Sequence, residues 1–222
     1  MQPEDLARTI DHTLLRADGT STDVERLCRE AASFRFAAVC VFPHFVPLAS
    51  ACLQGTDVKV CTVIAFPFGA ETARVKALAA GEAVARGAAE VDVVIDVPAF
   101  LSGDHDLVRD ELAGVVRAVR THDRTVVKAI IETCYLDDEQ KLLACRICEE
   151  AAVDFVKTST GYGPAGATVH DVGLLRGCLD ERVGVKASGG IRTLHDAEAM
   201  IAAGASRIGT SAGAAIMAES AA

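Results

Sequence analysis

The 222-residue sequence lacks features that would place it in three classes of protein. No apolar run approaches the ~18 residues of a membrane span, and the opening MQPEDLARTIDHTLL is too acidic and too weakly apolar for a signal peptide. There is no cluster of Lys and Arg, and the net charge of −9 argues against a nucleic-acid surface. We therefore expect a cytoplasmic protein that acts on a small soluble molecule, without nucleic acid or membrane partners.

The eight cysteines lack the spacing of a metal site. Cys145 and Cys148 form a single C-x-x-C inside a helical pattern, without the second pair or the His that zinc requires. Cys40, Cys61 and Cys134 also lie in apolar periodic segments, where a free thiol behaves as a small apolar side chain. Reduced thiols and no metal are predicted.

Short β-branched runs alternate with longer segments of helical period along the whole chain. Strands are expected at 9–13, 37–42, 58–64, 90–95, 125–131, 153–157, 183–188 and 206–210. Helices are expected at 22–34, 44–53, 70–86, 104–121, 137–151, 168–178, 194–203 and 212–219. Ser21 or Thr22 and Thr193, the last with Asp196, are candidate helix caps.

Eight strands that each precede a helix close most economically as a TIM (β/α)8 barrel. No linker or low-complexity segment divides the chain, so a single α/β domain over 1–222 is expected. The alternative is a dinucleotide-binding fold, because Gly161, Gly163 and Gly166 spell G-x-G-x-x-G in GYGPAG. That motif needs a helix beginning within it and an acidic residue ending the next strand, and the sequence provides neither.

Three lysines fall on successive predicted strands at equal spacings of 29 residues: Lys128, Lys157 and Lys186. Asp92 lies on the preceding strand, inside EVDVVI. One such residue is more often solvated or paired than functional. We expect the three lysines to lie in register on adjacent strands beside the aspartate, and such a set is costly to bury unless its members pair or change protonation. This pattern predicts an active site at the carboxyl ends of the strands.

Crowded lysines favour Schiff-base chemistry, in which a neutral amine attacks a carbonyl. A free lysine has a pKa of about 10.4, so something must favour the neutral form at pH 7. Two ammonium groups about 6 Å apart repel by roughly 3 kcal/mol at an effective dielectric of 20. Lys157 has a lysine on each side and is the predicted nucleophile, with Lys186 as the perturbing cation and Asp92 as a proton relay. Whether Lys128 reaches the mouth is left open.

Two glycine-containing segments, ASGGIRT (187–193) and GTSAG (209–213), follow the last two predicted strands. Backbone N–H groups in such turns bind anions, and TIM barrels frequently hold phosphate after these strands. Tight turns alone would also explain Gly189 and Gly190. The favoured interpretation is a phosphate site with Gly190 and Ser211 as donors, closed from the other side by TSTG (158–161).

These residues resemble the deoxyribose-phosphate aldolase family of Schiff-base (class I) aldolases on TIM barrels. The similarity includes IDHTLL (10–15), VCTVIAFPFGA (60–70), AEVDVVI (89–95), VVKAIIET (126–133) and RIGTSAG (207–213). DFVKTSTG (154–161) and VKASGGIR (185–192) form its most specific pair. The resemblance implies reversible cleavage of 2-deoxyribose 5-phosphate to acetaldehyde and glyceraldehyde 3-phosphate, in deoxyribonucleotide catabolism and without a cofactor.

The same resemblance implies roles for individual residues. Lys157 would form the Schiff base, and Lys186 and Asp92 would exchange protons. The implied substrate-binding residues are Asp11, Cys40, Thr160, Gly161, Gly189, Gly190 and Ser211. A homodimer is also implied. The sequence departs from the family pattern at Ala212, where many members have a second serine, at VIDVPAF (94–100) and at EEAAVDF (149–155).

Two alternatives to this aldolase stay open from the sequence. One is a Schiff-base aldolase with a different acceptor or a longer sugar phosphate. The other is a phosphate-binding barrel without an imine, either an isomerase or a non-catalytic binding module.

Overall fold

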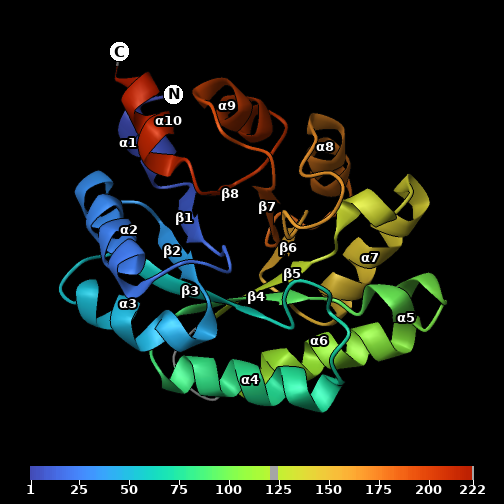
Figure 1. The fold of residues 1–222 in the computed structure, drawn as a ribbon. Helices are drawn as coiled ribbons and strands as arrows, with labels where there is room; N and C mark the ends of the chain where they lie inside the picture. Colours follow the sequence, from blue (N-terminus) through green and yellow to red (C-terminus); the bar gives the residue numbers. More distant parts are fainter. Residues whose placement is uncertain (121–124, 222) are drawn as a thin grey trace.

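A closed barrel of parallel strands forms the centre of the molecule (Figure 1). The computed structural model describes residues 1–120 and 125–221, and within them eight strands pair in chain order, with β8 closing onto β1. The strands are β1 (Ile10–Leu14), β2 (Ala38–Val41), β3 (Lys59–Ile64), β4 (Glu90–Val94), β5 (Val126–Ile130), β6 (Phe155–Lys157), β7 (Gly184–Ser188) and β8 (Arg207–Thr210). The predicted TIM barrel is confirmed.

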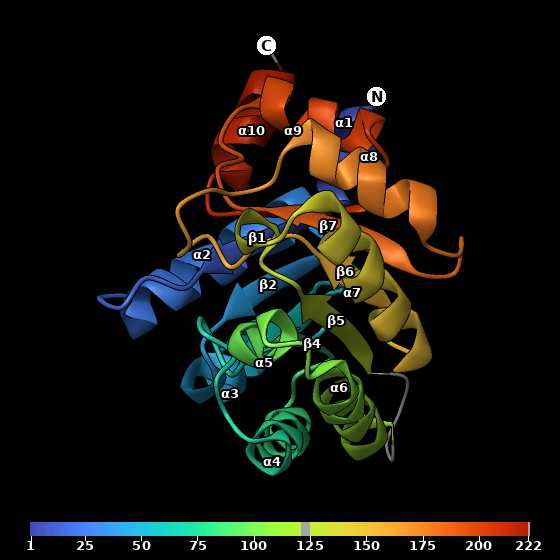
Figure 2. The same ribbon diagram turned by 90° about the vertical axis from the view of Figure 1, so that its right-hand side faces the viewer.

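Helices surround the barrel on its outside (Figures 1 and 2). They are α1 (Pro3–Ala7), α2 (Ser21–Phe34), α3 (Val46–Cys52), α4 (Ala73–Ala85), α5 (Val97–Leu101), α6 (His105–Val119), α7 (Asp138–Glu150), α8 (Val169–Cys178), α9 (Leu194–Ala202) and α10 (Gly213–Ser220), with 3-10 turns η1 (Pro43–Phe45) and η2 (Thr133–Tyr135). None of the helices in the described ranges has the length and apolar character needed to cross a membrane.

The predicted helices are confirmed with shifted ends, and two short helices were not predicted. The segment expected at 44–53 divides into η1 and α3, and residue 121 of the helix expected at 104–121 lies outside the described residues. The unpredicted helices α1 and α5 have five residues each, which is too short for a periodic pattern. Each carries a proline in its first turn.

Two helix starts test the predicted caps. Thr20, one residue before the predicted positions, caps α2 in a reciprocal capping box with Asp23, so the prediction of Ser21 or Thr22 was wrong. Ser21 is the first helical residue instead. The Thr193–Asp196 capping box at the start of α9 is confirmed.

Strand residues alternate between two different environments. Outward-facing positions such as Val91, Val127 and Val156 are fully buried against the helices. The apolar cluster inside the barrel is much smaller and lies on β2, β3 and the end of β1: Leu15, Ala38, Cys40, Cys61 and Val63. The interior beside β4 to β8 is therefore available for polar groups.

One ion pair is fully buried outside the barrel, between α4 and α6. Lys76 Nζ lies 2.7 Å from Glu111 Oε2 and donates to the carbonyl oxygen of Val94 at 3.0 Å. The other oxygen of Glu111 accepts a hydrogen bond from the backbone N–H of Asp96 at 2.8 Å. This pair was not predicted, because nothing in the helical pattern places the two side chains opposite each other.

Candidate active site

Charged side chains fill the part of the barrel interior that the apolar cluster leaves free. They come from β1, β4, β5, β6, β7 and β8 and form one connected set of ion pairs. Among the described residues, this set contains four cations and three carboxylates: Lys128, Lys157, Lys186 and Arg207, with Asp11, Glu90 and Asp92. The carboxylates therefore leave one positive charge unbalanced if all seven groups are ionised.

Asp92 lies at the centre of this set. Its Oδ2 is 2.7 Å from the Nζ atoms of both Lys157 and Lys186, while its Oδ1 is 2.9 Å from Lys128 Nζ and accepts from Cys61 Sγ at 3.1 Å. Burial alone would raise the pKa of Asp92, but the three lysines outweigh it and hold this pKa well below its usual range. Asp92 is consequently a stable anion that two lysines share through one oxygen.

Lys186 is held between two carboxylates. Its Nζ lies 2.5 Å from Asp11 Oδ2 and 2.7 Å from Asp92, and Asp11 in turn binds Arg207 through Oδ1 at 2.5 Å. Burial would lower the pKa of Lys186, but the charges of Asp11 and Asp92 raise it well above its ordinary value. Lys186 therefore remains a cation beside Lys157, with which it pairs in register across β6 and β7.

Lys128 lies one layer deeper than the other two lysines. In the register of β5 and β6, Ile130 and not Lys128 is the partner of Lys157. Lys128 instead contacts Glu90 at 2.5 Å and Asp92 at 2.9 Å, at full burial. The expectation that three lysines lie in register on adjacent strands was therefore wrong for Lys128, which sits behind Asp92.

Lys157 differs from its neighbours in both pairing and access. Asp92 is its only carboxylate contact among the described residues, and its side chain retains a small exposure of 4%. It also lines a cavity of about 320 Å³ at the carboxyl end of the barrel. This lysine thus combines the weakest pairing in the set with contact to the cavity.

That polar cavity also contains most of the residues predicted to bind phosphate. Thr160, Gly161, Gly189, Gly190 and Ser211 line it together with Lys157. The structure adds Arg16 and Arg192, which were not predicted, although Arg192 lies within the quoted ASGGIRT segment. From the turn after β8, Gly209, Thr210 and Ser211 line the cavity, and the backbone N–H of Ala212 donates to Thr210 Oγ1.

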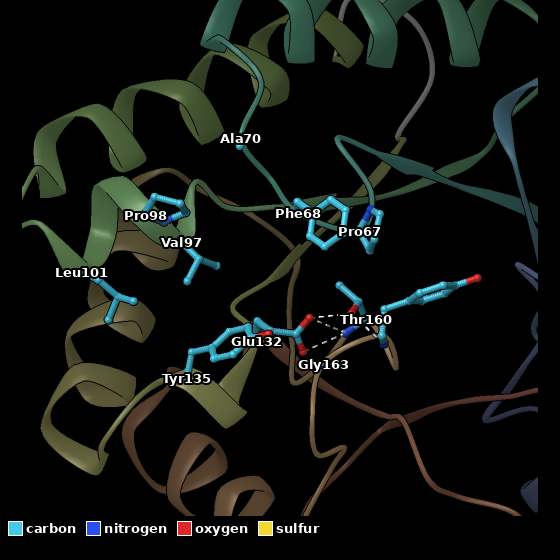
Figure 3. Close-up of a pocket in the computed structure, with 11 residues that line it drawn as sticks. Pro67, Phe68, Ala70, Val97, Pro98, Leu101, Glu132, Tyr135, Thr160 and Gly163 are labelled. Carbon is cyan, nitrogen blue, oxygen red and sulfur yellow. Dashed lines mark hydrogen bonds between the residues drawn. The ribbon is translucent and has the colours of Figure 1, made fainter.

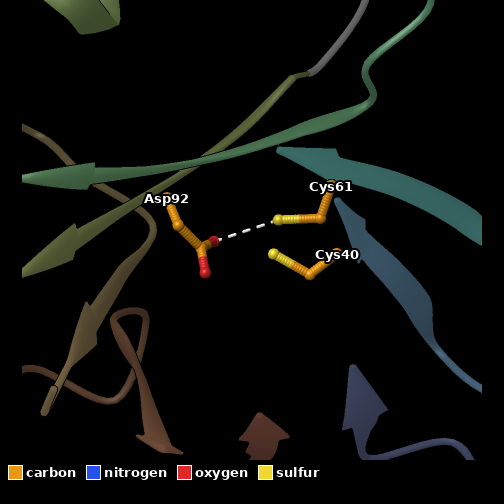
Figure 4. Close-up of side chains that lie close together, drawn as sticks. All are labelled: Cys40, Cys61 and Asp92. Atoms are coloured by element: carbon orange, nitrogen blue, oxygen red, sulfur yellow. Dashed lines mark hydrogen bonds between the residues drawn. The ribbon is translucent and has the colours of Figure 1, made fainter. Parts of the chain in front are cut away.

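Asp11 and Cys40 lie deeper than the resemblance implied. Both are fully buried, and neither is among the described residues that line the cavities at the mouth. Cys40 and Cys61 are register partners on β2 and β3, and their sulfur atoms lie near Asp92 (Figure 4). These three residues could offer metal ligands, but Asp92 is already bound by three lysines.

A second cavity, of about 290 Å³, lies at the same end of the barrel beside α5 (Figure 3). Its lining is apolar: Pro67, Phe68, Val97, Pro98, Leu101 and the ring of Tyr135. Glu132 is the one charged lining residue in the described part of the chain, and it adopts a left-handed backbone conformation with φ of 52°. Its carboxylate accepts hydrogen bonds from the backbone N–H and the hydroxyl of Thr160.

The G-x-G-x-x-G segment serves close packing in this structure. A Cβ at Gly163 would lie 2.8 Å from Cys134 Sγ, and one at Gly166 would lie 2.1 Å from the carbonyl oxygen of Gly189. Helix α8 begins only at Val169, after the motif, as the rejection of a dinucleotide site required. The glycines allow the loop after β6 to touch the loops after β5 and β7.

The fold and the lysine cluster define a TIM-barrel enzyme with an amine at the mouth of the barrel. Residues 6–219 match the model of the DeoC/LacD family of aldolases. The chain belongs to this family.

The curated relatives of this chain include proteins named deoxyribose-phosphate aldolase. The relative from Thermoanaerobacter sp. (strain X514) is 55% identical over 96% of each chain, and that from Lysinibacillus sphaericus is 50% identical over 96% of this chain and 95% of its own. A solved structure of deoxyribose phosphate aldolase from Aeropyrum pernix, described as a unique tetrameric structure, is similar with a TM-score of 0.91 and 37% identity, and the match covers 98% of this chain and 91% of that chain.

Proposed function

We propose that this aldolase reversibly cleaves 2-deoxy-D-ribose 5-phosphate to acetaldehyde and D-glyceraldehyde 3-phosphate through an imine on Lys157. The observation that carries the proposal is the surplus cation of the barrel, because the cluster reaches charge balance when one lysine is neutral. Lys157 has the fewest carboxylate contacts of the three lysines and is the one that lines the polar cavity. The names of the relatives support the same substrate.

Each step of this reaction has a group in reach. The neutral amine of Lys157 adds to the aldehyde carbon of the open-chain sugar, and loss of water gives the iminium. The bond between C2 and C3 then breaks as the C3 hydroxyl gives up its proton, so C3 leaves as the aldehyde carbon of D-glyceraldehyde 3-phosphate and the bonding electron pair forms the enamine. Protonation of the enamine and hydrolysis release acetaldehyde. Asp92 and Lys186 would exchange these protons, because Asp92 Oδ2 contacts Lys157 Nζ and the same oxygen contacts Lys186 Nζ.

The polar cavity would hold the phosphate at the far end of the sugar. Gly189 and Gly190 both line the cavity with φ above +80°, a backbone conformation that glycine adopts at no steric cost and that lets the backbone approach an anion closely. Ser211, Thr160 and Gly161 would complete the cup, with the cation of Arg192 on the same cavity. The homodimer and the cytoplasmic location expected from the sequence remain predictions. Light scattering in solution would test the homodimer.

Borohydride reduction in the presence of acetaldehyde tests the imine directly. We expect a stable mass increase on one peptide, with Lys157 as the modified residue, and no increase in Lys157→Met. Lys59→Met, which removes an exposed lysine outside the cluster, is the matched control and should be modified like the wild type. A phosphate-binding barrel without an imine would give no adduct. An adduct on another lysine would show that Lys157 is not the nucleophile.

A further inference from the structure

The two cavities at the mouth have opposite lining chemistry and share a boundary. The polar cavity takes its walls from the loops after β1, β6, β7 and β8, whereas the apolar cavity takes most of its walls from the loops after β3, β4 and β5. Among the described residues, the two cavities have only Thr160 and Tyr162 in common. These two residues therefore form the wall between them.

The side chain of Tyr162 forms part of this wall. Its hydroxyl donates to the carbonyl oxygen of Leu15 at 2.5 Å, and its ring packs edge-on against Phe66 at a centroid distance of 5.4 Å. The side chain thus crosses from the loop after β6 to the loop after β1. Yet Tyr162 is 54% exposed, so a single hydrogen bond and one ring contact hold a largely solvated group in place.

The backbone beneath this side chain is fixed independently. Thr160 donates its N–H and its hydroxyl to Glu132, and its hydroxyl oxygen accepts from the N–H of Tyr162 at 3.0 Å. Glu132 is buried, and Figure 3 shows its carboxylate directed at Thr160. Replacing the side chain of Tyr162 would therefore remove the wall while leaving the loop that follows Lys157 anchored.

From this arrangement we infer that the apolar cavity is a binding site for the alkyl or aryl tail of an unphosphorylated aldehyde acceptor, and that Tyr162 determines substrate preference by restricting access to it. The position of the cavity relative to Lys157 and its apolar lining indicate this occupant. A carbonyl carbon beside Lys157 can extend its tail into the polar cavity or, past residue 162, into the apolar one. The carboxylate of Glu132 is occupied by hydrogen bonds from Thr160, and the other lining side chains are mostly apolar.

This inference rests on the proposed function and uses the same bond-forming step in the synthetic direction. The enamine of acetaldehyde on Lys157 attacks the carbonyl carbon of the acceptor. One carbon–carbon bond forms, the carbonyl oxygen takes up a proton to become a hydroxyl, and hydrolysis of the imine returns the amine of Lys157. No further reactant is needed beyond the two aldehydes and water.

The test compares acceptors of increasing chain length, from propanal to octanal, with D-glyceraldehyde 3-phosphate. In Tyr162→Ala, we expect kcat/KM for hexanal relative to the phosphorylated acceptor to rise at least about tenfold over wild type. Within the alkyl series it should grow by roughly fourfold for each buried methylene until the cavity is filled. Tyr162→Phe keeps the ring and loses only the bond to Leu15, so its gain should be about twofold to threefold.

A second substitution locates the effect. Adding Leu101→Glu to Tyr162→Ala puts a carboxylate at an exposed position of the apolar lining and should cancel the gain for hexanal. Leu78→Ala removes an exposed apolar side chain of α4 that lines neither cavity, and it should leave the acceptor ratio at the wild-type value. If Tyr162→Ala folds poorly, Tyr162→Val replaces it.

Three results would overturn the inference. The acceptor ratio in Tyr162→Ala could equal that of the wild type, the gain could persist with Leu101→Glu, or Leu101→Glu could change the oligomeric state and show that the cavity is an interface between copies of the chain. Failure of the proposed function looks different, because the borohydride adduct on Lys157 would then be absent from the wild type as well.

Discussion

Two sets of buried charges in this molecule differ in charge balance and in access to a cavity. Between α4 and α6, Lys76 and Glu111 form a closed pair whose remaining polar atoms bind the backbone at Val94 and Asp96. Inside the barrel, four cations share three carboxylates, and Lys157 lies at the edge of the set beside a cavity. The first set is balanced and sealed, whereas the second carries a surplus charge and is open.

The difference shows that burial of a lysine is not by itself a sign of function. Lys76, Lys128 and Lys186 are all fully buried, yet each is matched by carboxylates. The features that distinguish Lys157 are a single carboxylate contact and access to a cavity. Substitutions of single residues in each set test whether pairing and cavity access separate a catalytic lysine from a structural one.

The largest effect is expected for Lys157→Met. Turnover of 2-deoxyribose 5-phosphate should fall by at least ~10³-fold, because the covalent route is closed. The free energy of unfolding should stay within about 1 kcal/mol of the wild type, since the remaining three cations and three carboxylates then balance. Steady-state kinetics and urea unfolding measure the two quantities. Substantial unfolding with retained turnover would reverse the assignment.

Lys76→Met should give the converse result. Loss of this lysine leaves the buried carboxylate of Glu111 without its cation, so the free energy of unfolding should fall by about 3–5 kcal/mol. Turnover per folded molecule should be unchanged. The double variant with Glu111→Leu should regain much of the lost stability, and a double variant as unstable as Lys76→Met would contradict the ion-pair explanation.

Lys186→Met should shift the pH dependence of turnover. The wild-type enzyme has a permanent cation at this position, because the pKa of Lys186 is raised by Asp11 and Asp92 despite burial. Without this cation the cluster has no surplus positive charge, so the acid limb of the kcat profile should move to higher pH. Lys59→Met is the control, and an unshifted limb in Lys186→Met would show that the two lysines are uncoupled.

The smallest effect concerns the pH dependence of stability, for which the two sets have opposite signs. Asp11 and Asp92 have lowered pKa values, so the stability they contribute is complete above about pH 4 and is lost as the pH falls. Burial raises the pKa of Glu111 in spite of Lys76, so its contribution is present below about pH 4 and is lost as the pH rises.

Glu111→Gln isolates this second slope. The variant should lose the decline above pH 4 and keep the acid decline of the barrel carboxylates. Urea unfolding between pH 3 and pH 7 measures both. A variant curve parallel to that of the wild type would remove Glu111 from the explanation.

The sequence predicted the barrel because each β-branched run and each helical segment carries its own periodic signal. It also predicted that Lys157 and Lys186 would lie side by side, since each occupies the same place in its βα unit. The depth of Lys128 could not be predicted, because equal spacing along the chain does not determine the register between β5 and β6.

The groups that balance the lysines were only partly predictable. Asp92 stood out as a charge within an apolar strand, but Glu90 and Arg207 lie at strand starts, where a charged residue normally faces solvent. Glu132 and Lys76 gave no signal, because a hydrogen bond between two loops and an ion pair between two helices depend on how those elements pack. Contacts of this kind are tertiary and need coordinates.

The backbone contact between Gly166 and Gly189 has a practical consequence for directed evolution. A methyl group at position 166 would meet a carbonyl oxygen at 2.1 Å, in the turn proposed to bind phosphate. Position 162, four residues earlier, carries a side chain that is half in solvent. A mutant library that seeks new acceptors should therefore randomise residue 162 and keep the glycine at 166. The substitutions then change the wall between the two cavities and leave the turn proposed to bind phosphate intact.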